Sequence, residues 1–151
     1  MKIRKATLKD IPQIYKIVND FSLQDLMLPR SLNQLYENIR DFWVCEKNGK
    51  VYGCCSLHVI WKDLAEIRSL AVIQSEQNKG IGTKLIKTTL KEAENLKIEK
   101  IFMLTKLTEF FEKFGFKKVP KKALPRKIWA ECINCYKFPN YCDETALVRE
   151  L

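Results

Sequence analysis

The chain has 151 residues and a formal net charge of +9, with 46% hydrophobic and 30% charged residues. This size predicts one domain over residues 1–151, and apolar runs of only a few residues exclude a membrane-spanning helix. Because the amino-terminal residues lack the apolar stretch of a secretory signal, and because few aromatics accompany the basic residues, we expect a cytoplasmic protein that binds neither membranes nor nucleic acid.

The first part of the chain predicts one strand and two helices. Residues 3–6 have strand character, and Asp10 with Pro12 is typical of a helix N-terminus. Ser31 and Gln34 have the spacing of a capping box, in which each side chain bonds to the backbone amide of the other residue. We therefore expect a second helix to begin after Ser31.

Strands predominate further along the chain. Asn48-Gly49 lies between apolar runs at 42–46 and 51–59, which predicts a β-hairpin. The remaining expected elements are a strand at 64–72, a helix at 83–96, a strand at 101–105, a short helix capped by Thr108 and ended by Gly115, and strands at 116–120 and 145–148.

A polar turn, Gln77-Asn78-Lys79-Gly80-Ile81-Gly82, joins the strand at 64–72 to the long helix. The first N–H groups of a helix have no intrahelical acceptor, and the helix dipole makes this end partly positive, so the position favours a phosphate. Gly80 and Gly82 have no Cβ to keep phosphate oxygens away, and Lys79 adds a positive charge. The spacing fits neither the dinucleotide pattern nor the nucleotide phosphate loop.

This turn resembles the Gln/Arg-x-x-Gly-x-Gly/Ala signature of the GNAT superfamily of N-acetyltransferases, and residues 110–116, Phe-Phe-Glu-Lys-Phe-Gly-Phe, resemble a later segment of that superfamily. The resemblance implies an α/β fold with a mixed, mostly antiparallel sheet of six to seven strands, about four helices and two splayed central strands. It also implies acetyl-CoA as co-substrate, with no metal needed for the chemistry. The residues expected to bind acetyl-CoA are Leu70, Ala71, Val72, Gln77, Asn78, Lys79, Gly80, Ile81, Gly82, Thr83, Phe111 and Phe114.

Several separated segments resemble the short, stand-alone N-acetylglutamate synthases of bacterial arginine synthesis. These segments are residues 28–31, 66–72, 102–105 and 124–129. The resemblance implies acetyl transfer to the α-amine of L-glutamate, with Arg30, Ser31, Arg68 and Lys127 around this acceptor. Guanidinium groups bind carboxylates through paired charged hydrogen bonds, which agrees with such a substrate. The alternative for each basic residue is an ordinary surface charge.

The superfamily resemblance also implies catalytic roles. Glu66 lies on the strand where members carry a carboxylate that takes the amine proton; the alternative is a structural salt bridge with Arg68, which shares its strand face. Many members carry a tyrosine where this chain has Phe111, and phenylalanine cannot protonate the leaving thiolate. We expect Thr108, or alternatively Thr105, to position that proton.

The six cysteines form two groups. The first group, expected to be reduced thiols in the core, consists of Cys45, Cys54 and Cys55. In the second group, Cys132 and Cys135 have the spacing of a zinc site and Cys142 could be a third ligand. No fourth ligand is evident, because the only histidine, His58, is distant in sequence, and buried thiols without metal are the favoured interpretation.

The sequence leaves alternatives to glutamate acetylation. They are the same chemistry on another small amine or a protein amino terminus, a non-catalytic acyl-CoA sensor, and a zinc-dependent interaction module. Basic residues around the acceptor disfavour cationic amines, and Glu66 disfavours a silent sensor. The oligomeric state, monomer or homodimer, and feedback by arginine are left open.

Overall fold

The computed structural model describes residues 1–124 and 143–151. A seven-stranded sheet within these residues has the strand order β1-β2-β3-β4-β5-β7-β6. The strands are β1 (Lys2–Lys5), β2 (Phe42–Lys47), β3 (Lys50–Trp61), β4 (Leu64–Val72), β5 (Lys100–Thr105), β6 (Lys117–Val119) and β7 (Thr145–Glu150). Neighbouring strands are antiparallel except β4 and β5, which are parallel. The predicted mixed, mostly antiparallel sheet is confirmed.

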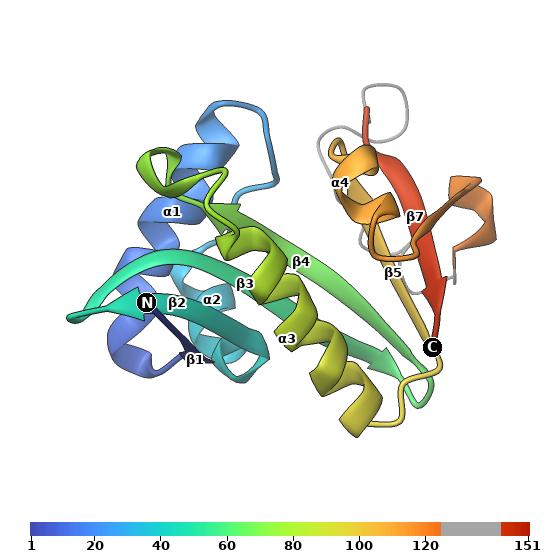
Figure 1. Ribbon diagram of the computed structural model, residues 1–151, viewed down its shortest axis with the longest axis horizontal. Coiled ribbons are helices and arrows are strands. Elements are labelled where there is room, and N and C mark those ends of the chain that lie inside the picture. The colour runs from blue at the N-terminus through green and yellow to red at the C-terminus, as the bar shows by residue number, and fades with distance from the viewer. Residues whose placement is uncertain (125–142) are drawn as a thin grey trace.

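Helices cover both faces of this sheet (Figure 1). The helices are α1 (Ile11–Leu23), α2 (Leu32–Glu37), α3 (Ile81–Asn95) and α4 (Thr108–Glu112), with single turns η1 (Leu8–Asp10), η2 (Ile39–Asp41), η3 (Gln74–Glu76) and η4 (Lys121–Ala123). The apolar face of α1 forms one core cluster with Leu35 of α2 and inward residues of β2 and β3. On the opposite face, α3 packs Leu85, Ile86 and Ala93 into a second cluster. No helix in the described residues is both long and apolar enough to cross a lipid bilayer.

Two local sequence signals predict their elements correctly. Asn48 and Gly49 both have positive φ, at 53° and 79°, and Lys47 pairs with Lys50 across the two-residue turn that joins β2 to β3. Positive φ at both positions is the requirement of the turn type that matches strand twist. Ser31 accepts from the Gln34 amide at 3.1 Å and its own amide donates to the Gln34 side chain at 2.9 Å, so the capping box is formed.

Three predicted helix starts differ in detail. The long helix begins at Ile81 rather than at Thr83, because Gly80 at φ 85° is its N-cap. Thr108 does not cap α4, since Leu107 holds the N-cap position and its amide donates to the Thr105 hydroxyl at 2.9 Å. Asp10 precedes α1 as predicted but makes no capping hydrogen bond to it.

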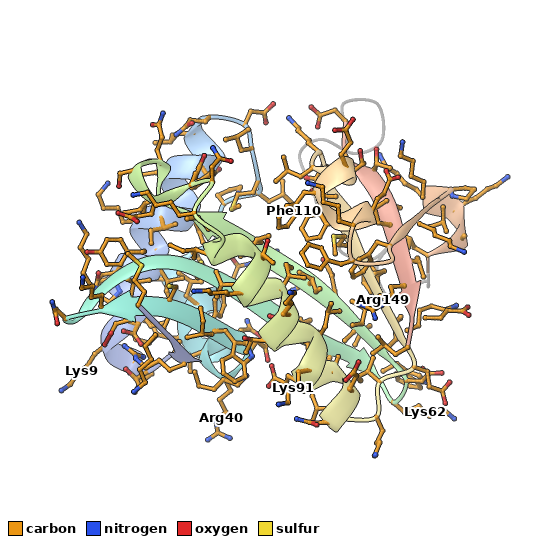
Figure 2. All side chains as sticks on the ribbon, viewed as in Figure 1. Lys9, Arg40, Lys62, Lys91, Phe110 and Arg149 are labelled. Atoms are coloured by element: carbon orange, nitrogen blue, oxygen red, sulfur yellow. The ribbon has the colours of Figure 1, made fainter. Side chains whose placement is uncertain are left out.

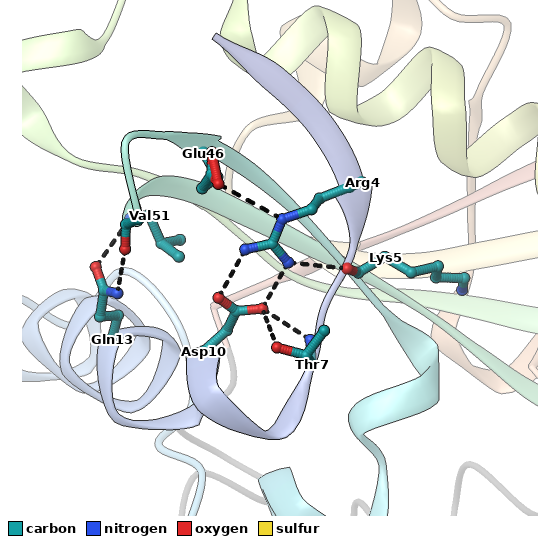
Figure 3. A network of polar contacts seen from close by, with 8 residues as sticks. Arg4, Lys5, Thr7, Asp10, Gln13, Glu46 and Val51 are labelled. Atoms are coloured by element: carbon teal, nitrogen blue, oxygen red, sulfur yellow. Dashed lines mark hydrogen bonds and ion pairs between the residues drawn. The ribbon is translucent and has the colours of Figure 1, made fainter.

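The Asp10 carboxylate instead anchors β1 (Figure 3). Arg4 donates to both of its oxygens, at 2.7 and 2.9 Å, and the Thr7 amide donates to it at 2.7 Å. Arg4 Nε also lies 3.8 Å from the Glu46 carboxylate on β2. The hydrogen bonds from Arg4 hold the pKa of the Asp10 carboxyl below its usual value, although burial of that group acts in the opposite direction.

This anchor predicts a pH-dependent stability. Asp10→Asn should lower the free energy of unfolding at pH 7 by about 2 kcal/mol, because Arg4 loses its charged acceptor. A carboxyl with a lowered folded-state pKa stabilises the protein above its unfolded-state pKa, and this contribution disappears as pH falls through the folded-state value. In urea unfolding, the deficit of the variant should therefore shrink as pH falls below about 4.

Asp20→Asn is the matched control. Asp20 pairs with Lys16, but the two side chains are 50% and 75% exposed. Its loss should change the free energy of unfolding by less than about 0.5 kcal/mol. Equal losses in the two variants would contradict an anchoring role for Asp10.

Cys45, Cys54 and Cys55 lie in the core as predicted. Burial raises the pKa of the Cys55 thiol to about 12 and also raises the pKa of Cys54. These thiols are therefore protonated and unreactive at neutral pH. The zinc alternative concerns residues 132–142, which lie outside the described residues.

Candidate active site

The strands β4 and β5 separate within the sheet (Figure 1). Three parallel pairs join them: Leu64 with Lys100, Ala65 with Ile101 and Glu66 with Phe102. Beyond these pairs, residues 67–72 of β4 and 103–105 of β5 both line a cavity. The predicted splayed strand pair is therefore present, and Glu66 lies where the separation begins.

A distortion of β4 lies on the wall of this cavity. Cys54 of β3 pairs with Ala71 and Ser56 pairs with Arg68, so Ser69 and Leu70 together face the single residue between them. Such a bulge bends the strand and breaks its regular pairing. Ser69 accordingly has a positive φ of 53°.

The cavity has a volume of about 1460 Å³. Small-molecule sites usually occupy about 300 to 1,000 Å³, so this one has room for two substrates. The predicted site residues that line it are Arg30, Glu66, Arg68, Leu70, Ala71, Val72, Gln77, Asn78, Gly80, Ile81, Gly82, Thr83 and Phe111. Of the other predicted residues, Ser31, Lys79, Thr108 and Phe114 do not line it, and Lys127 lies outside the described residues.

The glycine turn forms one end of the cavity. Lys84 donates to the Gly80 carbonyl at 3.0 Å, so the amides of Ile81, Gly82 and Thr83 precede the first intrahelical bond. Gln77 donates to the carbonyl of Val72 at 2.9 Å and fixes the turn against the end of β4. The turn thus presents helix N-terminal amides to the cavity, as an anion site requires.

Gly80 and Gly82 differ in what the fold requires of them. Gly80 has a φ of 85°, which an L side chain rarely adopts. A Cβ on Gly82 would lie 3.5 Å from Phe110, an ordinary contact, so the fold itself leaves room for it. Packing within the protein therefore does not account for a glycine at position 82.

Lys79 lies at the rim rather than inside. Its ammonium group is 3.4 Å from the Glu76 carboxylate, and its side chain is 60% exposed. Gln77, Asn78 and the glycines, by contrast, line the cavity.

Aromatic rings face the glycine turn from α4. Phe110 projects between the two parts of the sheet (Figure 2) and lines the cavity together with Phe111. Phe110 makes edge contacts with Phe111 and Phe114, at centroid distances of 5.0 and 5.3 Å. Phe110 was not among the predicted residues, although it adjoins Phe111 in the motif.

Glu66 and Arg68 form a mostly buried ion pair on β4. Arg68 Nε lies 3.0 Å from Glu66 Oε2, and each side chain is 12% exposed. The salt bridge with Arg68, which was the alternative interpretation of Glu66, is therefore present. Both residues also line the cavity, so the pair brings one negative and one positive group to the same wall.

Arg30 reaches the cavity from the segment before α2. The Asn19 side chain accepts from the Arg30 amide at 3.3 Å and donates to its carbonyl at 3.0 Å, which fixes the backbone of Arg30 against α1. Ser31 caps α2 and is exposed. Of this pair, only Arg30 lines the cavity.

Sequence reasoning missed a histidine and an aspartate at this end of the cavity. His58 Nδ1 lies 2.7 Å from Asp41 Oδ2, and both residues line the cavity. The register of β3 and β4 places His58 directly opposite Glu66. The hairpin turn alone does not indicate this pairing, because a bulge between Val59 and Trp61 shifts the register before it reaches His58.

Lys106 connects two segments at the cavity edge. Its ammonium group donates to the Asp25 carbonyl at 2.7 Å and lies 2.7 Å from the Asp143 carboxylate. The Asp143 bond is the main reason that the pKa of Lys106 is raised. The loop after α1 is thereby joined to the segments beside β5 and β7.

The profile of the Acetyltransferase (GNAT) family matches residues 8–116. The chain belongs to the GNAT acetyltransferase family. The matched region contains the glycine turn, the splayed strands and Glu66. The protein is therefore an N-acetyltransferase of the GNAT type.

Relatives of this GNAT protein extend the comparison. It is 39% identical to an uncharacterized N-acetyltransferase of Chlorobaculum tepidum, over 99% of this chain and 96% of the relative. It is 35% identical to an amino-acid acetyltransferase of Mycobacterium tuberculosis, over 89% of this chain and 78% of the relative.

Two solved GNAT structures are similar over the described fold. A Mycobacterium tuberculosis protein in complex with CoA and NLQ is 31% identical, with a TM-score of 0.87, covering 100% of this chain and 99% of that one. The N-acetylglutamate synthase of Neisseria gonorrhoeae, complexed with coenzyme A and N-acetyl-glutamate, is 30% identical with a TM-score of 0.89. This chain covers only 35% of the Neisseria protein, while 99% of this chain is matched.

Acetyl-CoA is the acyl donor of this GNAT protein, and the described residues fit it. The glycine turn supplies amides for a diphosphate, and the separated edge of β4 can accept an extended chain. The cavity connects these two features. Within the described residues, no cluster of histidine, cysteine or carboxylate side chains could hold a metal ion.

The glycine turn yields a prediction that separates binding from stability. Gly82→Ala should weaken coenzyme A binding by about tenfold or more, because a methyl group would stand where a phosphate approaches the amides. The free energy of unfolding should stay within about 1 kcal/mol, since alanine is the better helix former and has room beside Phe110. Calorimetric titration and urea unfolding measure the two effects.

Gly49→Ala is the control variant, for which we expect a loss of stability and no loss of coenzyme A binding. Gly49 has a φ of 79° in the β2–β3 turn, far from α3 in the chain. Alanine there should cost about 1 kcal/mol of stability and leave coenzyme A affinity unchanged. If Gly82→Ala binds coenzyme A as tightly as the unmodified protein, the turn is not the phosphate site.

Proposed function

We propose that this GNAT protein transfers acetyl from acetyl-CoA to the α-amine of L-glutamate, the reaction that begins bacterial arginine synthesis. One observation carries the proposal: Arg30, Arg68 and Glu66 line the same cavity as the glycine turn. Two guanidinium groups suit an acceptor with two carboxylates, and a carboxylate beside them suits an incoming ammonium group. The names of the Mycobacterium and Neisseria relatives support an amino-acid acceptor.

In this proposal Glu66 is the general base. The acceptor arrives as an ammonium ion, and its N–H bond breaks as Glu66 takes the proton. The free amine then forms a bond to the thioester carbonyl carbon, and the carbonyl oxygen gains negative charge. The bulge at Ser69 and Leu70 would turn the Leu70 amide toward that oxygen.

The C–S bond breaks in the final step, the electron pair leaves on sulfur, and the second proton of the nitrogen passes to the thiolate or to water. Phe111 cannot supply a proton, and Thr108 lies off the cavity while Thr105 lines it. An ordinary thiol has a pKa of about 8.5, so departure as thiolate needs little assistance. Thr105 is therefore the better placed of the two threonines to position a proton or a water molecule.

A thiol-release assay tests the proposal directly. Acetyl-CoA is combined with the protein and each of the twenty amino acids, and with several polyamines. L-Glutamate should give the highest kcat/KM, with N-acetylglutamate identified as product by mass spectrometry. Faster turnover of a polyamine would instead assign a cationic acceptor and overturn the proposed role of the two arginines.

A further inference from the structure

In the proposed mechanism the amine proton ends on Glu66, a mostly buried carboxylate that is paired with Arg68. Glu66 is only 9% exposed, and its carboxylate lies 3.0 Å from the Arg68 guanidinium. A proton that neutralises Glu66 gives up this Coulomb attraction. The proton must therefore leave Glu66 before the next turnover.

His58 lies directly opposite Glu66 on the neighbouring strand. The two residues face each other across β3 and β4, and directly opposed side chains stand on the same face with Cβ atoms about 5 Å apart. His58 is also closer to solvent, with 28% of its side chain exposed against 12% for Glu66. A path through His58 thus runs from the buried base toward water.

Asp41 fixes the state of the imidazole. A carboxylate is only an acceptor, so the 2.7 Å contact requires the His58 proton to be on Nδ1. In the neutral ring the lone pair is then on Nε2, which is the atom left to take a proton. When Nε2 is protonated, the adjacent carboxylate stabilises the imidazolium.

We propose that His58 takes the ammonium proton from Glu66 at Nε2 and releases it to solvent, with Asp41 as its positioning carboxylate. This step rests on the proposed acetyl transfer. The O–H bond on Glu66 breaks, an N–H bond forms on His58, and the same proton then passes to water or buffer. Both groups return to their starting states and no other reactant is consumed.

Other charged residues line the same cavity as His58. Besides Asp41 on η2, the charged residues that line the same cavity are Glu66 and Arg68 on β4, Arg30 before α2, Glu37 on α2, Glu76 on η3, Lys106, Lys113, Lys121 on η4, and Glu144. The Asp41 contact, however, determines which nitrogen holds the proton.

The first test needs no turnover. The chain contains one histidine, so nitrogen NMR of labelled protein reports on His58 without assignment. The neutral ring should be protonated at Nδ1, and Asp41→Ala, which removes the acceptor, should lose this preference. A neutral ring protonated at Nε2 in the unmodified protein overturns the proposal, because that atom could not accept a proton.

The second test uses kinetics. His58→Gln, which can still hydrogen-bond to Asp41, should lower kcat by about 10- to 100-fold and leave the KM for acetyl-CoA unchanged. The kcat of His58→Ala should increase when imidazole is added. A purely structural role predicts no imidazole rescue, and a rise in amine KM with normal kcat also refutes the relay.

Different results would contradict the glutamate acceptor and the His58 relay. If the unmodified protein acetylates another amine but not glutamate, the proposed acceptor is wrong, and the same variants are measured with that amine. If glutamate is the acceptor and the His58 variants keep normal kcat, only the relay is wrong. Coenzyme A binding by each variant checks that the cavity is intact.

Discussion

Glu66→Gln should lower kcat by about 100-fold or more at neutral pH, with little change in the KM for acetyl-CoA. Glutamine keeps the size of the side chain but cannot take the ammonium proton. The loss should be greatest at low pH and diminish as pH rises, because a larger fraction of the amine is then already neutral. A pH series of kcat with L-glutamate and saturating acetyl-CoA measures this effect.

Glu66 also pairs with Arg68, so a structural effect of Glu66→Gln must be separated from a catalytic one. Removing the charge of Glu66 leaves Arg68 with a changed partner in a mostly buried position, so thermal unfolding and coenzyme A binding of the variant should be measured as well. Glu94→Gln, at an exposed position of α3, should behave as the unmodified protein. Equal kcat for Glu66→Gln and the unmodified protein across pH would leave Glu66 with only its structural contact.

Arg30→Gln should raise the KM for L-glutamate by about 100-fold and leave the KM for acetyl-CoA unchanged. Two charged hydrogen bonds to a carboxylate contribute about 2 to 3 kcal/mol, which corresponds to this change. Asn19 holds the backbone of Arg30 on both sides, so the substitution should remove the guanidinium without moving the segment. Initial rates with each substrate varied in turn separate the two KM values.

Arg40→Gln is the matched control for Arg30. Arg40 lies on η2, is exposed and projects away from the body of the protein (Figure 2). Its substitution should change neither KM. If the two arginine variants behave alike, or if Arg30→Gln weakens both substrates equally, Arg30 does not bind the acceptor carboxylate.

Local signals predicted most of the secondary structure. The Asn48-Gly49 turn, the Ser31–Gln34 capping box and the strand at 64–72 depend on neighbouring residues, which the sequence displays directly. Thr108 was expected to cap α4 because of its residue type. The Thr105 hydroxyl accepts from the Leu107 amide instead, a choice that depends on how β5 ends.

The candidate site was predicted only where a motif exists. The glycine turn and Glu66 carry the superfamily pattern, and both line the cavity. His58 belongs to no motif, and its importance comes from Asp41 and Glu66, which are brought to it by chain folding. Lys106 likewise meets Asp25 across 81 residues, a contact that no local pattern indicates.

The decisive measurement is a crystal structure of the protein with coenzyme A and L-glutamate. We expect the coenzyme diphosphate on the amides of residues 81–83, the thiol between β4 and β5, and the glutamate amine within hydrogen-bond reach of Glu66. A coenzyme bound elsewhere, with those amides bonded within the protein and the amine remote from Glu66, would contradict this expectation.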